Sequence, residues 1–245
     1  MQDGHLIDEE FDIRLKSPGP IEQFFVENAI KQFHYLHKYP DPRCMSFIYS
    51  VFLRGEWVGC LVFGRPQAGR LFKGPITYGS LGDIESGRAQ YCRWEVLNLA
   101  RVWFSPSVQR EGEHCWPQLL PGFYDRKGNW RSSFASTVIR AAIDKVRIDY
   151  LLMFPPVFFQ KYNIKVVLSY CDTRIHRGVV YSASGFHLAS KNRDKIETWT
   201  YDNVTPLSPA EDTAIRYAGK HHPRSIQKRN VRSVSLPPGF LFGAD

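Results

Sequence analysis

The sequence predicts an α/β domain in which helices flank a mixed central sheet. Apolar residues recur at helical spacing in two stretches, 21–33 and 135–146, whereas the other regular runs are short and rich in β-branched and aromatic residues. The chain order is helix, hairpin, strand, helix, strand, short helix and strand. This alternation is typical of a sheet that is covered by helices.

The first helix and a hairpin make up the first part of the domain. The helix is expected to begin at Ile21 and to run into residues 33–37, and Pro40 ends it. Two β-rich runs, 47–53 and 57–64, then flank a short turn that contains glycine. This is the pattern of a β-hairpin.

The middle of the chain alternates between loops and regular elements. Residues 65–90 are rich in Gly and Pro and predict a loop. Residues 94–104 predict a strand, and 105–130 predict a long loop or insertion, which at this length is often functional. The second long helix opens at Ser132 and Ser133, either of which can cap it.

Three short elements complete the domain. Residues 164–170 predict a buried strand that leads into Asp172, residues 178–186 a short helix closed by glycine, and residues 196–201 a last strand. The chain is accordingly divided into a polar N-terminal segment (1–20), a single catalytic domain (21–205) and a basic C-terminal extension (206–245).

The C-terminal extension and the overall charge favour a polyanionic partner. Six Lys or Arg residues and no acid lie between Arg216 and Arg232, and the whole chain has a formal net charge of +8. Clustered cations of this kind contact nucleic-acid phosphates without reading sequence. The alternative is a charged terminus that is merely solvated.

Cysteine usage and hydropathy indicate the compartment. The chain has five cysteines, an odd number, and no CxxC pair, which favours a reducing environment without disulfides or a zinc ribbon. The N-terminus does not read as a signal peptide, and no apolar run reaches the roughly 18 residues of a membrane span. We therefore expect a cytoplasmic protein with no membrane partner.

Two constellations could carry chemistry at the ends of strands and helices. Ser132, Ser133 and Ser136 line a helix start, where free amides could hold a phosphate of a nucleotide-like cofactor, although a simple cap is the common alternative. Asp172 ends a buried strand and Tyr181 follows at a helix start, so the pair could serve as base and acid or as metal ligands. The alternative is a solvated aspartate and a half-buried core tyrosine.

A third constellation is the histidine pair at the end of the first helix. His34 and His37 share one helical face if the helix persists, and imidazoles together with a carboxylate suit iron, zinc or manganese. Capping or solvated histidines are the usual alternative.

Taken in order, several of these motifs resemble one family. They are His34-Tyr35, LARVWF at 99–104, the serine-rich helix start at 132–136, SYCDT at 169–173 and GVVYSASGF at 178–186. The last two resemble the SYAD and GxIYQAS pattern of the Mom-type DNA-modification proteins of bacteriophages. The fold of that family is similar to GNAT N-acyltransferases, and the similarity spans residues 21 to 201.

The resemblance implies a specific activity and site. It implies modification of the exocyclic N6 amine of adenine in duplex DNA, which shields phage DNA from restriction inside an infected bacterium. The implied metal, most simply iron, falls on His34, Tyr35, Asp172 and Tyr181, with His34, Asp172 and Tyr181 as catalytic residues. The cofactor pocket falls near Arg101 and the serines of the helix start, and the donor of the acyl or carbamoyl-type group is left open, acetyl-CoA or a related compound being one choice.

Two other functions remain open from the sequence. A conventional GNAT enzyme would acetylate a small amine or a peptide from acetyl-CoA without depending on DNA. A DNA-binding protein could keep the fold and perform no chemistry, and its binding would be sensitive to salt.

Overall fold

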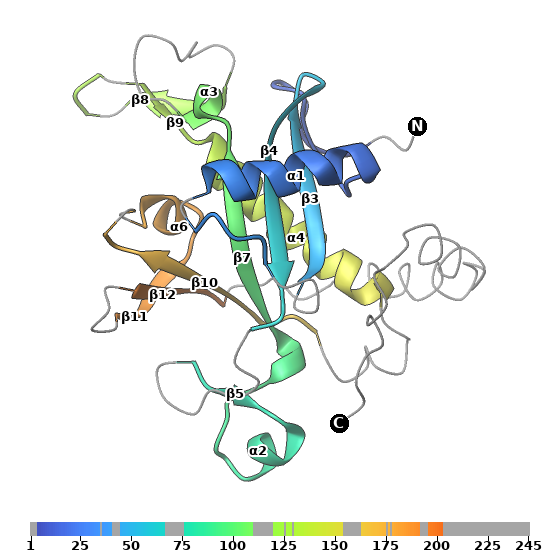
Figure 1. The fold of residues 1–245 in the computed structure, drawn as a ribbon. Helices are drawn as coiled ribbons and strands as arrows, with labels where there is room; N and C mark the ends of the chain where they lie inside the picture. Colours follow the sequence, from blue (N-terminus) through green and yellow to red (C-terminus); the bar gives the residue numbers. More distant parts are fainter. Residues whose placement is uncertain are drawn as a thin grey trace.

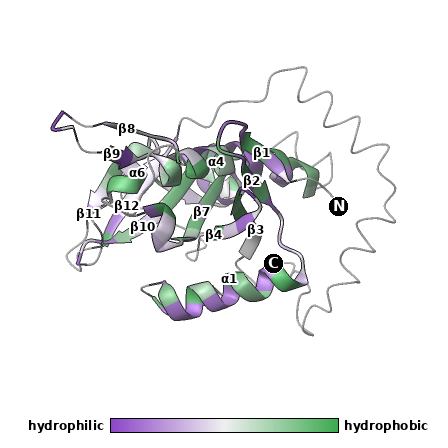
Figure 2. Cartoon of the chain, turned by 90° about the horizontal axis from the view of Figure 1, so that it is seen from above, coloured by the Kyte–Doolittle hydropathy of each residue, from purple (hydrophilic) through white to green (hydrophobic). Residues whose placement is uncertain are grey.

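A single mixed sheet with a long helix on each face organises the chain (Figures 1 and 2). The computed structural model describes residues 4–34, 36–40, 45–66, 76–109, 120–124, 126–128, 130–153, 163–174, 176, 178–191 and 196–202. This arrangement confirms the α/β class, with helices flanking a mixed central sheet, that the sequence predicts.

The main sheet has eight strands in the order β1-β2-β3-β4-β7-β10-β12-β11. All neighbouring strands are antiparallel except β7 and β10, which are parallel. The strands are β1 (His5–Asp8), β2 (Ile13–Lys16), β3 (Met45–Leu53), β4 (Glu56–Gly64), β7 (Val96–Phe104), β10 (Val166–Asp172), β11 (His187–Lys191) and β12 (Ile196–Tyr201).

Two long helices cover opposite faces of this sheet, as Figure 2 shows. Helix α1 (Pro20–Phe33) buries Val26 and Ile30 against Cys60 and Val62 of β4. Helix α4 (Phe134–Met153) buries the apolar stripe that the sequence shows at helical spacing, and it forms the main core together with β3, β4, β7 and β10. No described helix is long and apolar enough to cross a membrane.

Short elements extend from both ends of the sheet (Figure 1). At one end lies a small lobe made of β5 (Tyr78–Gly79), α2 (Leu81–Glu85) and β6 (Tyr91–Cys92), followed by a 3₁₀ turn at Arg93–Glu95. At the other end lie α3 (Pro106–Gln109) and a hairpin of β8 (Gly122–Tyr124) and β9 (Trp130–Ser132). A further helix in the described part of the chain is α6 (Val179–Ala183), between β10 and β11.

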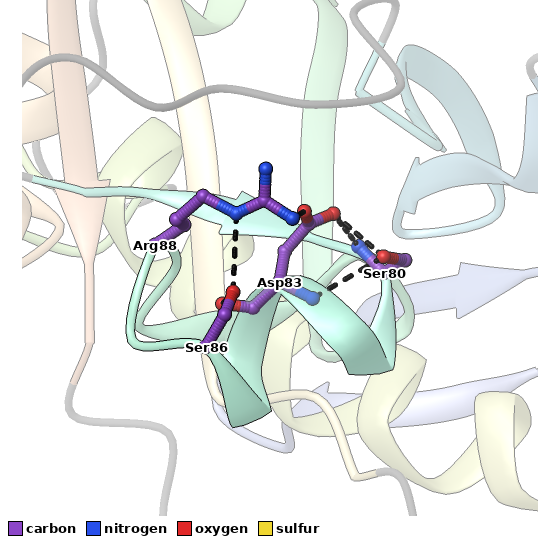
Figure 3. A network of polar contacts seen from close by, with 4 residues as sticks. All are labelled: Ser80, Asp83, Ser86 and Arg88. Carbon is purple, nitrogen blue, oxygen red and sulfur yellow. Dashed lines mark hydrogen bonds and ion pairs between the residues drawn. The ribbon is translucent and has the colours of Figure 1, made fainter.

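A capping box fixes the helix of the small lobe (Figure 3). The Asp83 carboxylate accepts hydrogen bonds from the backbone N–H and the hydroxyl of Ser80 at 2.8 and 2.6 Å, and the Ser80 hydroxyl in turn accepts one from the Asp83 N–H. Arg88 forms an ion pair with the buried Asp83 at 3.1 Å and donates to Ser86. These contacts provide hydrogen-bond partners for N–H groups at the start of the helix that have none within it. A helix this short is not stable alone.

The structure differs from the sequence-based elements in five places. Helix α1 ends at Phe33, so His34 and His37 do not share a helical face, and residues 105–130, expected as a loop, contain α3 and β8. Residues 5–16, expected as a polar segment, contribute two strands to the sheet, with Ile13 and Leu15 fully buried. Residues 65–90, expected as loop, contain α2 and β5, and β11 was not foreseen. These elements are short or mostly exposed, so their periodic signal is weak. The basic extension from residue 206 lies outside the described residues.

Gly178 offers a test of how α6 is held. Its φ is +67°, and a Cβ there would lie 2.5 Å from the Trp199 ring. Gly178→Ala should lower the free energy of unfolding by about 2 kcal/mol or more, since left-handed strain and a clash add together. Urea denaturation measures this change.

Gly128→Ala is the matched control, because Gly128 has a φ of +77° but nothing within 4 Å of an added Cβ. This variant should lose only about 1 kcal/mol, the cost of the backbone conformation. Equal losses in the two variants would show that contact with Trp199 does not constrain α6.

Candidate functional site

Strands β7 and β10 separate soon after they pair, and this opening is called the fork below. They are parallel neighbours over only three residue pairs, Val96–Asn98 with Val166–Leu168. Beyond that point β7 stays paired with β4, and β10 stays paired with β12. The two facing edges beyond the fork apex therefore share no ladder hydrogen bonds.

Two local features shape the fork just beyond its apex. The hydroxyl of Ser169 in β10 donates to the Leu99 carbonyl of β7 at 3.1 Å, which bridges the point of separation. Ala100 is an extra residue in β7, because Val62 pairs with Arg101 whereas Phe63 pairs with Leu99. Such β-bulges redirect side chains and occur often beside active sites.

At the apex itself lies a buried amide. Asn98 pairs with Leu168, and alternation places its side chain on the face of Val96, Val166 and Leu168. Its Oδ1 atom has no hydrogen-bond partner in the described part of the chain. A buried acceptor without a partner is costly, so Asn98 is a candidate for contact with a ligand.

Helix α4 begins at the open end of the fork. The ring of Phe134, its first residue, meets Phe104 at the end of β7 with centroids 5.6 Å apart. Ser133 precedes the helix, and its carbonyl accepts hydrogen bonds from the Thr137 N–H and the Ser136 hydroxyl. The Ser132 hydroxyl accepts one from the Phe134 N–H. Of the three predicted serines, Ser132 thus caps this helix with its hydroxyl and Ser133 occupies the position before its first residue. The first amides of any such helix lack intrahelical partners.

His34 stands at the C-terminal end of α1 and is buried, with 7% of its surface exposed. Burial lowers its pKa to about 4, and the positive charges of Arg101, His176 and His37 add to the effect. Its Nδ1 atom accepts a hydrogen bond from the Leu36 N–H at 3.2 Å. At neutral pH His34 is therefore an uncharged imidazole.

Arg101 connects β7 to the segment that follows α1. Its Nε donates to the Lys38 carbonyl at 3.2 Å, and its Nη1 donates to the carbonyl of the bulge residue Ala100 at 2.6 Å. The guanidinium is close enough to lower the pKa of His34. The structure thus places Arg101 beside His34 and the fork, between the apex at Asn98 and the end of β7 at Phe104, where α4 begins.

Asp172 ends β10 as the sequence predicts, but its carboxylate is engaged. Arg174 donates to it from Nε at 2.9 Å, from Nη2 at 2.6 Å and from its backbone N–H at 3.0 Å. These hydrogen bonds hold the pKa of Asp172 at about 2. The carboxylate is therefore an ionised anchor for Arg174 and a weak base.

Tyr181 lies in α6 within an aromatic group. Its ring stacks on Trp199 with centroids 6.1 Å apart and meets Phe186 edge-on at 5.6 Å. Tyr181 packs against the main core, to which Cys171 also belongs. Because side chains alternate along β10, Asp172 lies on the opposite face of the sheet from Cys171. His176 interacts electrostatically with both His34 and Asp172. Tyr181, by contrast, packs among the aromatic rings of Trp199 and Phe186.

The residues proposed as metal ligands are only partly described. Tyr35 lies outside the described residues, and among those described no three His, Cys, Asp or Glu side chains gather in a way that could hold an ion. Both carboxylate oxygens of Asp172 accept from Arg174, and the Nδ1 of His34 accepts from Leu36. The described residues therefore do not support the expected iron site.

Four residues near the fork were not singled out from the sequence. They are Asn98, Ser169, Arg174 and His176. Arg174 carried a local signal, since it stands two positions after Asp172 in the turn that ends β10. Asn98, Ser169 and His176 come near the fork only in the folded sheet, so no local sequence pattern marks them.

Comparisons with known proteins give distant structural likenesses. No protein-family model matches the sequence, and no curated protein matches it. The chain is similar to the aminoglycoside acetyltransferase AAC(6')-Ib, solved with coenzyme A and kanamycin, at 10% identity and a TM-score of 0.43 over 78% of this chain and 95% of that one. It is also similar to a protein from Sphaerobacter thermophilus DSM 20745 described as an acetyltransferase, at 10% identity and a TM-score of 0.35 over 78% and 94%.

The buried His34 predicts a specific dependence of stability on pH. Its pKa is about 4 in the folded protein and lies near 6.5 in the unfolded chain, so the unfolded chain takes up the proton first as the pH falls. The free energy of unfolding should therefore decrease between pH 6.5 and 4, by at most about 1.4 kcal/mol per pH unit for this proton.

His34→Asn should remove this part of the pH dependence, because an amide oxygen can still accept from Leu36 but does not titrate. Urea denaturation at several pH values between 7 and 4 measures the slope for both proteins. Identical slopes would mean that His34 titrates normally in the folded state.

Proposed function

We propose that this chain is an N-acyltransferase of the GNAT type, with its acyl donor bound in the fork. The observation that carries the proposal is the separation of β7 and β10 after three residue pairs. Strand edges that face each other without a ladder are templates for an extended ligand with amide groups. The pantetheine arm of coenzyme A is such a ligand, and its thioester would lie near the apex.

The start of α4 supports the position of the donor's phosphates. Helix α4 has 20 residues, and its N-terminus lies at the open end of β7. The first amides and the helix dipole together favour an anion there. In this proposal Ser132, Ser133 and Ser136 border the phosphate site.

The transfer itself needs a nucleophile and a proton for the leaving group. The acceptor amine attacks the thioester carbonyl, the C–N bond forms, the C–S bond breaks, and the amine loses a proton while the thiolate gains one. Neutral His34, whose Nδ1 accepts from Leu36 and whose Nε2 therefore carries the proton, would donate a hydrogen bond to the thioester carbonyl oxygen. The phenol of Tyr181 would protonate the thiolate. Asp172, with its low pKa, would position Arg174 instead of acting as the base.

For the acceptor we propose the N6 amine of adenine in DNA. The net charge of +8 and the guanidinium groups of Arg101 and Arg174 beside the fork support a polyanionic substrate. An amine inside a duplex is out of reach, so the base would have to be extruded. Such a modification would protect phage DNA from restriction nucleases.

The cofactor site can be tested by changing the charge of a helix cap. Ser133→Asp keeps a good cap but places a negative charge where the donor's phosphates would lie. We expect the affinity for coenzyme A, measured by calorimetry, to fall roughly tenfold or more, since each tenfold step needs only about 1.4 kcal/mol.

Ser133→Asn is the matched control, because asparagine caps equally well without the charge. It should bind coenzyme A like the wild type. If both variants and the wild type bound coenzyme A equally, the phosphates would lie elsewhere.

The reaction is tested by mass spectrometry of nucleosides from DNA of cells that express the protein. The wild type should yield a heavier deoxyadenosine, whose mass identifies the added group. Tyr181→Phe should reduce the amount of this nucleoside at least 100-fold, because a general acid contributes roughly 10²–10⁴-fold to the rate. Tyr91→Phe, in the small lobe, should leave it unchanged. Unmodified DNA together with acetylation of small amines by the same protein would favour the conventional GNAT alternative.

A further inference from the structure

Four aromatic side chains form a continuous row on the face of the sheet that α1 covers. Phe33 stacks on Trp103 with centroids 5.8 Å apart, Trp103 stacks on Trp57 at 5.4 Å, and Trp57 meets Phe25 at 5.9 Å. The first two pairs are close to parallel, with interplanar angles of 26° and 20°. This set, called the aromatic row below, begins and ends on α1 and crosses β4 and β7.

The two ends of the aromatic row differ from its middle in exposure. Trp57 and Trp103 pack against the small cluster of Val26, Ile30, Cys60 and Val62. Phe33 is 64% exposed although it is the last residue of α1 and precedes the buried His34. An exposed ring that is already held parallel to a second ring presents its outer face at little cost in entropy.

Cationic side chains lie near the Phe33 end of the row. Arg101 lies two residues before Trp103 in β7 and is close to His34. Lys31 and Lys38 lie on either side of Phe33 in the sequence and are both exposed, and Lys31 forms an ion pair with Glu27 at 3.3 Å. Exposed aromatic rings interleaved with Lys and Arg are the chemistry that binds single-stranded nucleic acid, where bases stack and cations neutralise phosphates.

We infer that Phe33 is a stacking platform for an unpaired nucleobase of the acceptor strand, beside His34. The inference rests on the proposed function, because it names the residue that holds the acceptor. The aromatic row fixes the plane of the Phe33 ring, and the neighbouring cations hold the flanking phosphates. A base stacked there lies next to His34, which would donate to the thioester carbonyl that the amine attacks.

The experiment compares two phenylalanines on the same helix. Phe33 and Phe24 are both 64% exposed, but Phe24 touches Phe25 and not the Phe33 end of the row. Binding of a fluorescent single-stranded oligodeoxyadenylate is measured by anisotropy without any acyl donor. Phe33→Leu should lower the affinity roughly tenfold, as expected for the loss of one base–aromatic stack. Phe33→Trp should keep the wild-type affinity, and Phe24→Leu should leave it unchanged.

An abasic oligonucleotide of the same length separates stacking from charge. It should bind the wild type and Phe33→Leu with equal affinity, because it has phosphates but no bases. Equal loss of affinity in Phe33→Leu and Phe24→Leu, or no loss in either, would overturn the inference, and so would an equal effect of Phe33→Leu on the abasic strand.

The same measurements keep this inference separate from the proposed function. Because no donor is present, discrimination by Phe33 would stand even if no acyl transfer were found. Conversely, the protein could transfer acyl groups to small amines and bind both oligonucleotides with equal affinity. The transferase function would then stand, and the stacking role of Phe33 would be wrong.

Discussion

The short parallel contact between β7 and β10 is the constraint on which the rest of the site depends. The three residue pairs are held by the apolar side chains of Val96, Val166 and Leu168, which belong to one buried cluster. Beyond them each strand follows a different antiparallel partner, so the two edges diverge. Asp172 ends one of the diverging strands, the bulge at Ala100 lies in the other, and α4 begins where that other strand ends.

Electrostatics give the two titratable groups beside the fork opposite properties. Burial and nearby cations keep His34 neutral, whereas hydrogen bonds from Arg174 keep Asp172 ionised. His176 influences the pKa of both groups, so the two sites share one electrostatic neighbour. Environments that push pKa values apart in this way divide the roles of neighbouring residues.

The sequence predicted those parts of the fold that have a strong periodic signal. The stripe of α4, the hairpin of β3 and β4 and the glycine that ends α6 were readable because each rests on local spacing. The strands β1 and β2 were missed because the alternation of Ile13 and Leu15 covers too few residues. At the site, His34 and Asp172 could be selected by residue type, but Asn98 and Ser169 gain importance only from a tertiary separation of strands that no local pattern encodes.

The N-terminal strands also determine which part of β3 is left without a partner strand. Residues Ile13–Lys16 pair with Ser50–Leu53 of β3 and bury two apolar side chains completely. A chain that began at the first long helix would leave those four residues of β3 unpaired and would remove Ile13 and Leu15 from the main core. Unpaired strand edges are templates on which other chains add a strand. We therefore expect a protein shortened to the core that the sequence defines to self-associate more readily than one that keeps β1 and β2.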